Sequence, residues 1–226
     1  MTRTILTDAT IVFDLDGTLV NTAPDLTNAL NDVLTRRGHA AVSADYIRTA
    51  VGLGARAMIE AALARTGADE DIDAMLAEFL VHYESNIANE SRPFPGAIEV
   101  LARLEAAGAR LAICTNKREY LTRKLLRALD IDSRFRAIAG RDTFAAGKPN
   151  PMPLTGVIAA ASGETARALM VGDSDVDIRT ARAAAVPVVY VSFGYGAPID
   201  QEPPDATIDH FDALEEALHR CSQHWR

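Results

Sequence analysis

Short runs of hydrophobic residues, many of them β-branched, recur along the chain and predict buried strands. The first covers residues 11–13 and ends abruptly in the carboxylates of Asp14 and Asp16. Further strands are expected at residues 110–114, 137–139, 169–171, 188–191 and 206–208. The patterns between them predict helices at about residues 98–107, 119–129, 153–162, 178–185 and 211–221. Strands that alternate with helices indicate an α/β fold whose parallel sheet is covered on both faces.

The interval from residue 22 to residue 92 interrupts this alternation and contains no pattern typical of a strand. Its hydrophobic positions follow helical spacing, as at Leu26, Leu30, Val33 and Leu34. The Pro- and Gly-containing run at residues 93–96 is typical of a hinge that returns the chain to the sheet. We therefore expect a core of residues 1–21 and 93–226 and an inserted helical domain of residues 22–92. Such a domain acts either as a lid that excludes water from a site or as a packed appendage.

Composition and charge narrow the class of protein. The 226 residues are 48% hydrophobic, enough for a substantial core, and the formal net charge is −8. An acidic chain repels the phosphate backbone, so we expect no nucleic-acid partner. No stretch approaches the roughly 20 apolar residues of a membrane span, and residues 1–10 lack a signal-peptide core, so we expect a cytoplasmic protein without a membrane partner. The 2 cysteines show no spacing typical of zinc ligands.

The end of the first predicted strand combines several chemically active residues. Asp14 and Asp16 lie two residues apart, so in an extended chain their side chains leave the same face. Two carboxylates this close repel each other unless a cation neutralises them. Gly17 permits a sharp turn, and Thr18 adds a hydroxyl. An acidic turn after a core strand is the alternative, but the combination suits metal-assisted phosphoryl transfer.

Polar residues also follow other predicted strands, at Thr115-Asn116-Lys117, Gly147-Lys148-Pro149 and Gly172 to Asp177. Ligands of open α/β sheets bind at the carboxyl ends of the strands, so we expect these residues to meet at one edge. Asp14 and Asp173 would suit Mg²⁺, which prefers oxygen ligands and often keeps several waters. The Thr115 hydroxyl and Lys148 would bind the oxygens of a phosphoryl group.

On these motifs the chain resembles the haloacid dehalogenase-like phosphohydrolases and, within them, the phosphoglycolate phosphatase group. The four motifs of that superfamily occur in order as Asp14-Leu15-Asp16-Gly17-Thr18, Thr115, Lys148-Pro149, and Gly172-Asp173 with Asp177. The resemblance implies a Rossmann-like doubly wound parallel sheet core with an inserted all-helical cap domain. It also implies a Mg²⁺-dependent phosphatase that hydrolyses a small phosphate monoester through an aspartyl-phosphate intermediate.

The resemblance gives roles to the acidic residues. It implies that Asp14 is the nucleophile, and that Asp16 is the general acid/base and offers its backbone carbonyl to Mg²⁺. Asp173 would complete the metal site formed with Asp14 and Asp16. Asp177 would lie behind these groups and orient water or Lys148.

The resemblance also implies how the substrate is bound. Thr115, Asn116 and Lys148 would bind the phosphate. Related caps discriminate substrates with a loop that faces the active site. Here that loop would lie near residues 52–56, where Arg56 would pair with a substrate carboxylate; an Arg56 that is merely solvated is the alternative. The expected partner is a small phosphorylated metabolite, with 2-phosphoglycolate as the substrate.

Two other functions stay open from the sequence. Some relatives with the same cap are sugar-phosphate mutases, which move a phosphate around a sugar. A phospho-accepting signalling module also combines acids at strand ends with a Ser or Thr and a Lys-Pro. Such modules are much shorter, however, and Asp16 beside a phospho-aspartate would activate the hydrolytic water. A monomer and a homodimer are both compatible with the sequence.

Overall fold

The sheet of the protein is parallel and holds the predicted strands. The computed structural model describes residues 6–50, 52, 54–65, 67–196, 202–223 and 225. Within these residues one 6-stranded sheet is formed by β1 (Thr10–Phe13), β4 (Arg110–Cys114), β5 (Ala137–Ala139), β6 (Ala168–Gly172), β7 (Val188–Val191) and β8 (Ala206–Ile208). The order across the sheet is β5-β4-β1-β6-β7-β8, and every neighbouring pair is parallel.

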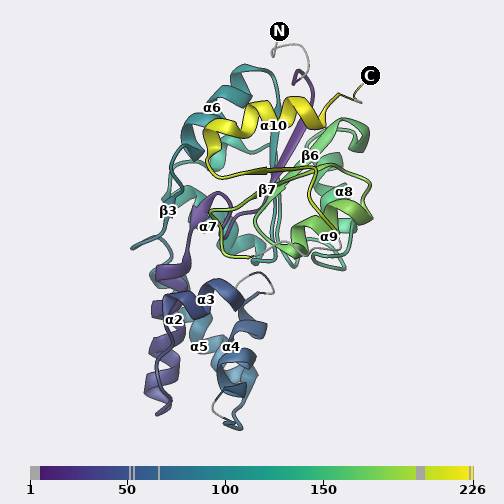
Figure 1. Ribbon diagram of the computed structural model, residues 1–226. Coiled ribbons are helices and arrows are strands. Elements are labelled where there is room, and N and C mark those ends of the chain that lie inside the picture. Colours follow the sequence, from purple (N-terminus) through teal and green to yellow (C-terminus); the bar gives the residue numbers. More distant parts are fainter. Residues whose placement is uncertain are drawn as a thin grey trace.

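Helices cover both faces of this sheet, as expected for a doubly wound fold (Figure 1). Side chains alternate between the faces, so that Ile11 and Phe13 of β1 join one hydrophobic cluster and Val12 joins the other. On the Val12 face pack α8 (Met152–Ala160) and α9 (Asp175–Ala183). On the other face pack α6 (Ala97–Ala106), α7 (Glu119–Ala128) and α10 (Leu214–Cys221). None of the helices in the described residues is long and apolar enough to cross a membrane.

The order of the strands reverses at β1, and this reversal positions the candidate site. From β1 the chain continues through β4 and β5 on one side, then crosses to β6 on the other side of β1. Such a reversal leaves a crevice beyond the carboxyl ends of the strands, where open α/β sheets bind ligands. The motifs that begin at Asp14, Thr115 and Asp173 follow β1, β4 and β6. The fold therefore brings three of the predicted motifs to one crevice.

Part of the chain between β1 and β4 forms a helical module that lies beside the sheet (Figure 1). It consists of α2 (Ala23–Arg36), α3 (Ala44–Ala50), α4 (Ala55–Ala64) and α5 (Ile72–Ser85). Helices α2 and α5 pack together through buried side chains that include Leu26, Leu30, Phe79 and Tyr83. The chain enters through β2 (Val20–Asn21) and leaves through β3 (Arg92–Pro93), which pair antiparallel. Because both connections run through this ladder, we propose residues 22–92 as the cap and residues 1–21 and 93–226 as the core.

Several element bounds differ from the sequence prediction. The strands β2 and β3 hold 2 residues each, too few to show a pattern, and β3 begins inside the interval expected to be wholly helical. Helix α9 begins at Asp175 instead of residue 178, because its first turn is polar and follows a capping box at Ser174. Helix α10 begins at Leu214, after a separate 3₁₀ turn at Phe211–Ala213.

Candidate active site

A tight loop after β1 carries Asp14 and Asp16. The Asp14 N–H donates to the Val171 carbonyl at 2.9 Å, which extends the pairing of β1 and β6 by one residue. The chain then turns at Gly17, with φ of +88°, and the Gly17 N–H donates to the Val20 carbonyl at 3.0 Å. A Cβ at Gly17 would lie 2.4 Å from Asp173 Oδ2, so glycine is needed for this close approach.

Asp14 lies in a buried charge cluster with Lys148 and Asp177. The Lys148 Nζ lies 2.8 Å from Asp14 Oδ1 and 2.6 Å from Asp177 Oδ1. Burial is the main cause that raises the pKa of Asp14 to about 7. Lys148 opposes this rise, and the carboxylates of Asp177 and Asp173 add to it. Burial by itself would lower the pKa of Lys148, but Asp14 and Asp177 outweigh it and raise that pKa overall. Lys148 is therefore a fixed cation beside the predicted nucleophile.

Asp177 holds Lys148 in place and is itself fixed by a helix cap. Its Oδ2 accepts hydrogen bonds from the Ser174 N–H at 3.1 Å and the Ser174 hydroxyl at 2.7 Å, which forms the capping box of α9. Its Oδ1 accepts from Lys148. Asp177 is 0% exposed, so it reaches a substrate only through Lys148. The role that the resemblance implies for Asp177, orienting water or Lys148, is compatible with this geometry and stays a prediction.

Asp173 is held by donors from two other loops. The Thr18 hydroxyl donates to its Oδ1 at 2.9 Å, and the backbone N–H groups of Tyr195 and Gly196 donate to its Oδ2 at 2.7 and 3.3 Å. Burial and the nearby Asp177 carboxylate raise the pKa of Asp173 to about 6, although these hydrogen bonds oppose the rise. The carboxylate is thus oriented before any ligand binds.

The acidic cluster fits an oxygen-ligated divalent cation. Asp14, Asp173 and Asp177 offer carboxylate oxygens that all lie within 4.8 Å of one another. Asp14 Oδ1 is buried, and its polar contact among the described residues is the ion pair with Lys148 Nζ at 2.8 Å. Three buried carboxylates against one lysine leave negative charge that a cation would neutralise. Asp14 and Asp173 are the ligands we infer, since each lines a cavity, whereas Asp177 is 0% exposed and lines neither of the two cavities described below.

Asp16 does not place its carboxylate in that cluster. Both of its carboxylate oxygens accept from Lys117 Nζ, at 3.0 and 3.1 Å, and Lys117 also lies 4.5 Å from the ring centroid of Tyr83 in α5. Any metal contact of Asp16 would therefore use its backbone carbonyl, as the resemblance implies. Its side chain stays available for proton transfer on the cavity side, where it lines the wall.

Thr115 and Asn116 lie at the same edge but differ in what they can bind. The Thr115 hydroxyl oxygen accepts a hydrogen bond from the Lys117 N–H at 3.2 Å, and Thr115 lines the cavity. Its O–H therefore stays available to donate a hydrogen bond to a phosphate oxygen. The Asn116 amide donates to the carbonyls of Lys148 at 3.1 Å and Gly52 at 3.2 Å. With its amide donors used in this way, Asn116 links the Lys148 loop to the cap, and a phosphate contact would fall to its backbone N–H.

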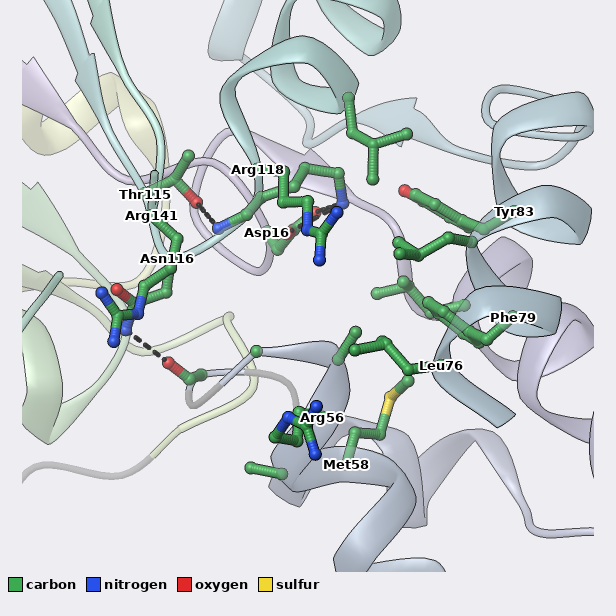
Figure 2. Close-up of a pocket in the computed structure, with 18 of the residues that line it drawn as sticks. Asp16, Arg56, Met58, Leu76, Phe79, Tyr83, Thr115, Asn116, Arg118 and Arg141 are labelled. Atoms are coloured by element: carbon green, nitrogen blue, oxygen red, sulfur yellow. Dashed lines mark hydrogen bonds and ion pairs between the residues drawn. The ribbon is translucent and has the colours of Figure 1, made fainter. Parts of the chain in front are cut away.

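A cavity of about 740 Å³ opens between this edge and the cap (Figure 2). Residues at the carboxyl edge of the sheet, among them Asp14, Asp16, Thr115 and Lys148, line one side. The cap supplies an opposing, largely apolar wall that includes Met58, Leu76, Phe79 and Tyr83. Asp173 lines a second, smaller cavity of about 200 Å³ next to Asp16. Asp16 and Gly52 line both cavities, so Asp173 and the larger cavity lie on either side of these two residues.

Arg56 lines the cavity but is already paired within the cap. Its guanidinium contacts the Asp73 carboxylate and lies 3.9 Å from Glu60, and its side chain is 48% exposed. A substrate carboxylate would have to compete with these acids. Of the neighbouring loop expected to face the site, Val51 and Leu53 lie outside the described residues.

Lys117 and Tyr195 contribute to the site in ways that the motifs alone do not indicate. Tyr195 accepts from the Ala23 N–H at 2.9 Å and donates to Asn21 Oδ1 at 2.7 Å, so it ties the Asp173 loop to the start of the cap. The glycines on either side of Tyr195 and the position of Lys117 directly after Thr115-Asn116 are the signals that could have pointed to them.

Gly17→Ala is expected to destabilise the protein and to lower the phosphatase activity that the resemblance implies. The added methyl group would collide with Asp173, and overpacking of this kind costs about 1–3 kcal/mol. Gly38→Ala is a matched control, because Gly38 has φ of +80° but nothing within 4 Å of its Cβ position. Thermal unfolding and phosphate release of both variants check this. Equal effects at the two positions would show that backbone strain, and not the contact with Asp173, requires the glycine.

Comparisons with known proteins agree on one family. The family model described as haloacid dehalogenase-like hydrolase matches residues 11–191. A phosphoglycolate phosphatase of Mesorhizobium japonicum is 51% identical over 208 residues, which cover 90% of this chain and 92% of that protein. A phosphoglycolate phosphatase of Agrobacterium fabrum is 46% identical, over 92% of this chain and 91% of the other. The crystal structure of a predicted phosphoglycolate phosphatase from Haemophilus somnus superimposes with a TM-score of 0.86 at 31% identity, covering 93% of this chain and 97% of that chain.

Proposed function

The chain belongs to the haloacid dehalogenase-like hydrolases and is a phosphatase, and we propose that it hydrolyses 2-phosphoglycolate with Mg²⁺ through a phosphorylated Asp14. The observation that carries the substrate is the name shared by relatives 40–51% identical over at least 90% of this chain. The mechanism is supported by the buried contact of Asp14 with Lys148 and by the acidic cluster around them.

In the first half-reaction an Asp14 carboxylate oxygen attacks the phosphorus. A bond forms between that oxygen and phosphorus, and the bond from phosphorus to the glycolate oxygen breaks. Lys148 and the Thr115 hydroxyl bind the phosphoryl oxygens and stabilise their negative charge in the transition state. Asp16, in its protonated form, gives its proton to the departing glycolate oxygen.

In the second half-reaction a water molecule attacks the phosphorus of the aspartyl-phosphate. Asp16, now a carboxylate, takes a proton from this water, and the bond between phosphorus and the Asp14 oxygen breaks. The products are inorganic phosphate and a regenerated Asp14. Because Lys117 contacts both Asp16 oxygens, it fixes the orientation of the carboxylate for both proton transfers.

The residues that would hold the metal are Asp14, Asp173 and the backbone carbonyl of Asp16. When bound, Mg²⁺ would neutralise charge on the phosphoryl group and offset the repulsion between the carboxylates. Thr18 and the N–H groups at Tyr195 and Gly196 keep Asp173 oriented for this purpose.

A panel of phosphate esters, assayed for phosphate release with Mg²⁺ and with a chelator, tests the proposed function. The expected result is Mg²⁺-dependent release with the highest kcat/KM for 2-phosphoglycolate. Hexose phosphates belong in the panel, because the cavity of about 740 Å³ is larger than a two-carbon acid needs. A higher kcat/KM for another ester would overturn the substrate but keep the mechanism. The absence of release from every ester, with conversion of one sugar phosphate to another, would favour a mutase.

A further inference from the structure

The cavity wall carries more cationic side chains than the proposed chemistry uses. Among the described residues that line it, the cations are Arg56, Lys117, Arg118, Arg141 and Lys148. Three of them are already neutralised by carboxylates: Arg56 by Asp73, Lys117 by Asp16, and Lys148 by Asp14 and Asp177.

Arg118 and Arg141 remain. Within the part of the chain that the structure describes, neither side chain forms an ion pair or hydrogen bond, and their exposed guanidinium groups are free to bind a ligand. Figure 2 shows the Arg118 guanidinium projecting into the open centre of the cavity and Arg141 lying beside Asn116. Arg56 lies on the opposite side, next to Met58 of the cap. The two unpaired cations therefore share the core side, near the phosphate-binding residues.

The loops that carry these arginines are locked together. The Arg141 N–H donates to the Lys117 carbonyl at 2.8 Å, and the Glu119 N–H donates to Asp142 Oδ1 at 2.8 Å. A Cβ at Gly140 would lie 2.3 Å from the Glu119 nitrogen, so the absence of a side chain there allows the contact. Arg118 and Arg141 are thus presented by one rigid unit and not by two independent surface loops.

The Arg141 side chain also has a defined place. A Cβ at Gly147 would lie 2.3 Å from Arg141 Cδ and 2.7 Å from its Nε, so the Arg141 side chain lies directly across Gly147. Gly147 immediately precedes Lys148. The Arg141 side chain therefore lies against the residue that directly precedes Lys148, the lysine that contacts Asp14.

A substrate with an anionic group besides its phosphate would need cationic partners for that group in the cavity, and Arg118 and Arg141 can provide them. The facing cap wall at Leu76, Phe79 and Leu80 is apolar and offers it no hydrogen bond. Guanidinium groups bind carboxylates in a bidentate manner and stay charged in partly desolvated sites.

We propose that Arg118 and Arg141 bind the carboxylate of the substrate, which stays on the leaving group when the phosphoryl group is transferred. The two arginines would thereby select phosphorylated carboxylic acids. The inference rests on the proposed phosphatase function and names its specificity determinants. Selection then comes from the core, beside the reacting phosphate, and Arg56 of the cap serves the packing of α4 against α5.

The test compares 2-phosphoglycolate with 2-hydroxyethyl phosphate, in which an alcohol replaces the carboxylate. Arg118→Met and Arg141→Met keep an unbranched, flexible side chain but remove the charged guanidinium group. Each is expected to lower kcat/KM for 2-phosphoglycolate by ~10–100-fold, mainly through KM, because a charged hydrogen bond to a bound group is lost. The loss with 2-hydroxyethyl phosphate is expected to be much smaller, and lysine at either position should restore part of the discrimination.

Two controls separate this role from general effects. Arg127→Met removes a cation of α7, the helix that begins directly after Arg118. Arg127 is 69% exposed and does not line the cavity, so this change should leave kcat/KM for both esters unaltered. Arg56→Met should affect both substrates alike. Equal losses with the two esters in the Arg118 and Arg141 variants, or a selective loss in Arg56→Met, would overturn the inference while the proposed function stands. A wild-type enzyme that turns over 2-hydroxyethyl phosphate but not 2-phosphoglycolate would overturn both.

Discussion

Asp14→Asn is expected to lower kcat for every phosphate ester by at least ~10⁴-fold, since the amide cannot form the covalent bond to phosphorus. Asp14 is 6% exposed, and its Oδ1 lies 2.8 Å from Lys148, the cation proposed to bind the phosphoryl group. Phosphate release with 2-phosphoglycolate and with an aryl phosphate measures the loss. Substantial residual turnover of either ester would contradict a covalent mechanism at this residue.

The fold of Asp14→Asn should survive the change. Lys148 keeps its 2.6 Å contact with Asp177, and one of three mutually repelling carboxylates is removed. The metal-free variant should therefore unfold at the same temperature as the wild type or higher. Asp8→Asn is the matched control, because Asp8 precedes β1 at the opposite edge of the sheet, where it pairs with Arg110. That control should retain full activity.

Asp16→Asn is expected to slow steady-state turnover of 2-phosphoglycolate by ~10²–10⁴-fold, the usual contribution of general acid/base catalysis. An aryl phosphate separates the two half-reactions, because its leaving group needs little protonation. With that ester the variant should release one equivalent of phenol per enzyme rapidly and then continue slowly, as water attack lacks its base. Rapid-quench measurement of the phenol shows both phases.

Lys117→Met distinguishes proton transfer from the mere loss of an ion pair. This change breaks the contact between Lys117 and Asp16 but leaves the Asp16 carboxylate in place. Its effect on turnover should be clearly smaller than that of Asp16→Asn. Equal effects of the two variants, or a steady-state rate of Asp16→Asn near that of the wild type, would remove Asp16 from the role of acid/base.

The sheet and its site edge could be predicted from the sequence because they rest on short-range patterns. The run at residues 11–13 is hydrophobic at every position, which is what a strand buried on both faces requires, and the structure places it in the centre of the sheet. Once parallel strands are expected, the carboxyl-edge rule brings Asp14, Thr115 and Asp173 together without knowledge of any distance.

Other features depend on contacts between distant residues and could not be read from a pattern. Lys117 and Asp16 are 101 residues apart, and nothing local marks them as an ion pair. The cap arginine Arg56 looked suited to a carboxylate, but its contact with Asp73 becomes visible only when α4 and the start of α5 are packed together. The ladder of β2 and β3 is specified by pairing across the whole cap insertion, and not by the residues of either strand.

The cap and the core are joined by several polar contacts in this structure. Asn116 donates to Gly52, Lys124 pairs with Glu84 at 3.1 Å, and Lys117 lies against the Tyr83 ring. Exposed pairs such as Lys124 with Glu84 contribute little stability, so these contacts are compatible with a cap that opens to admit substrate. The contact of Lys117 with both Asp16 and Tyr83 would connect such an opening to the orientation of the acid/base.

The proposed mechanism requires that Asp14 becomes phosphorylated, and peptide mapping of the acid-quenched enzyme measures this. Wild-type protein is mixed with 2-phosphoglycolate and Mg²⁺, quenched during steady-state turnover, digested and analysed by mass spectrometry. We expect a phosphoryl group on Asp14 in the peptide that contains Asp14 and Asp16, and no such modification in Asp14→Asn. Full turnover without any modified peptide, or modification at another residue, would contradict a phosphorylated Asp14.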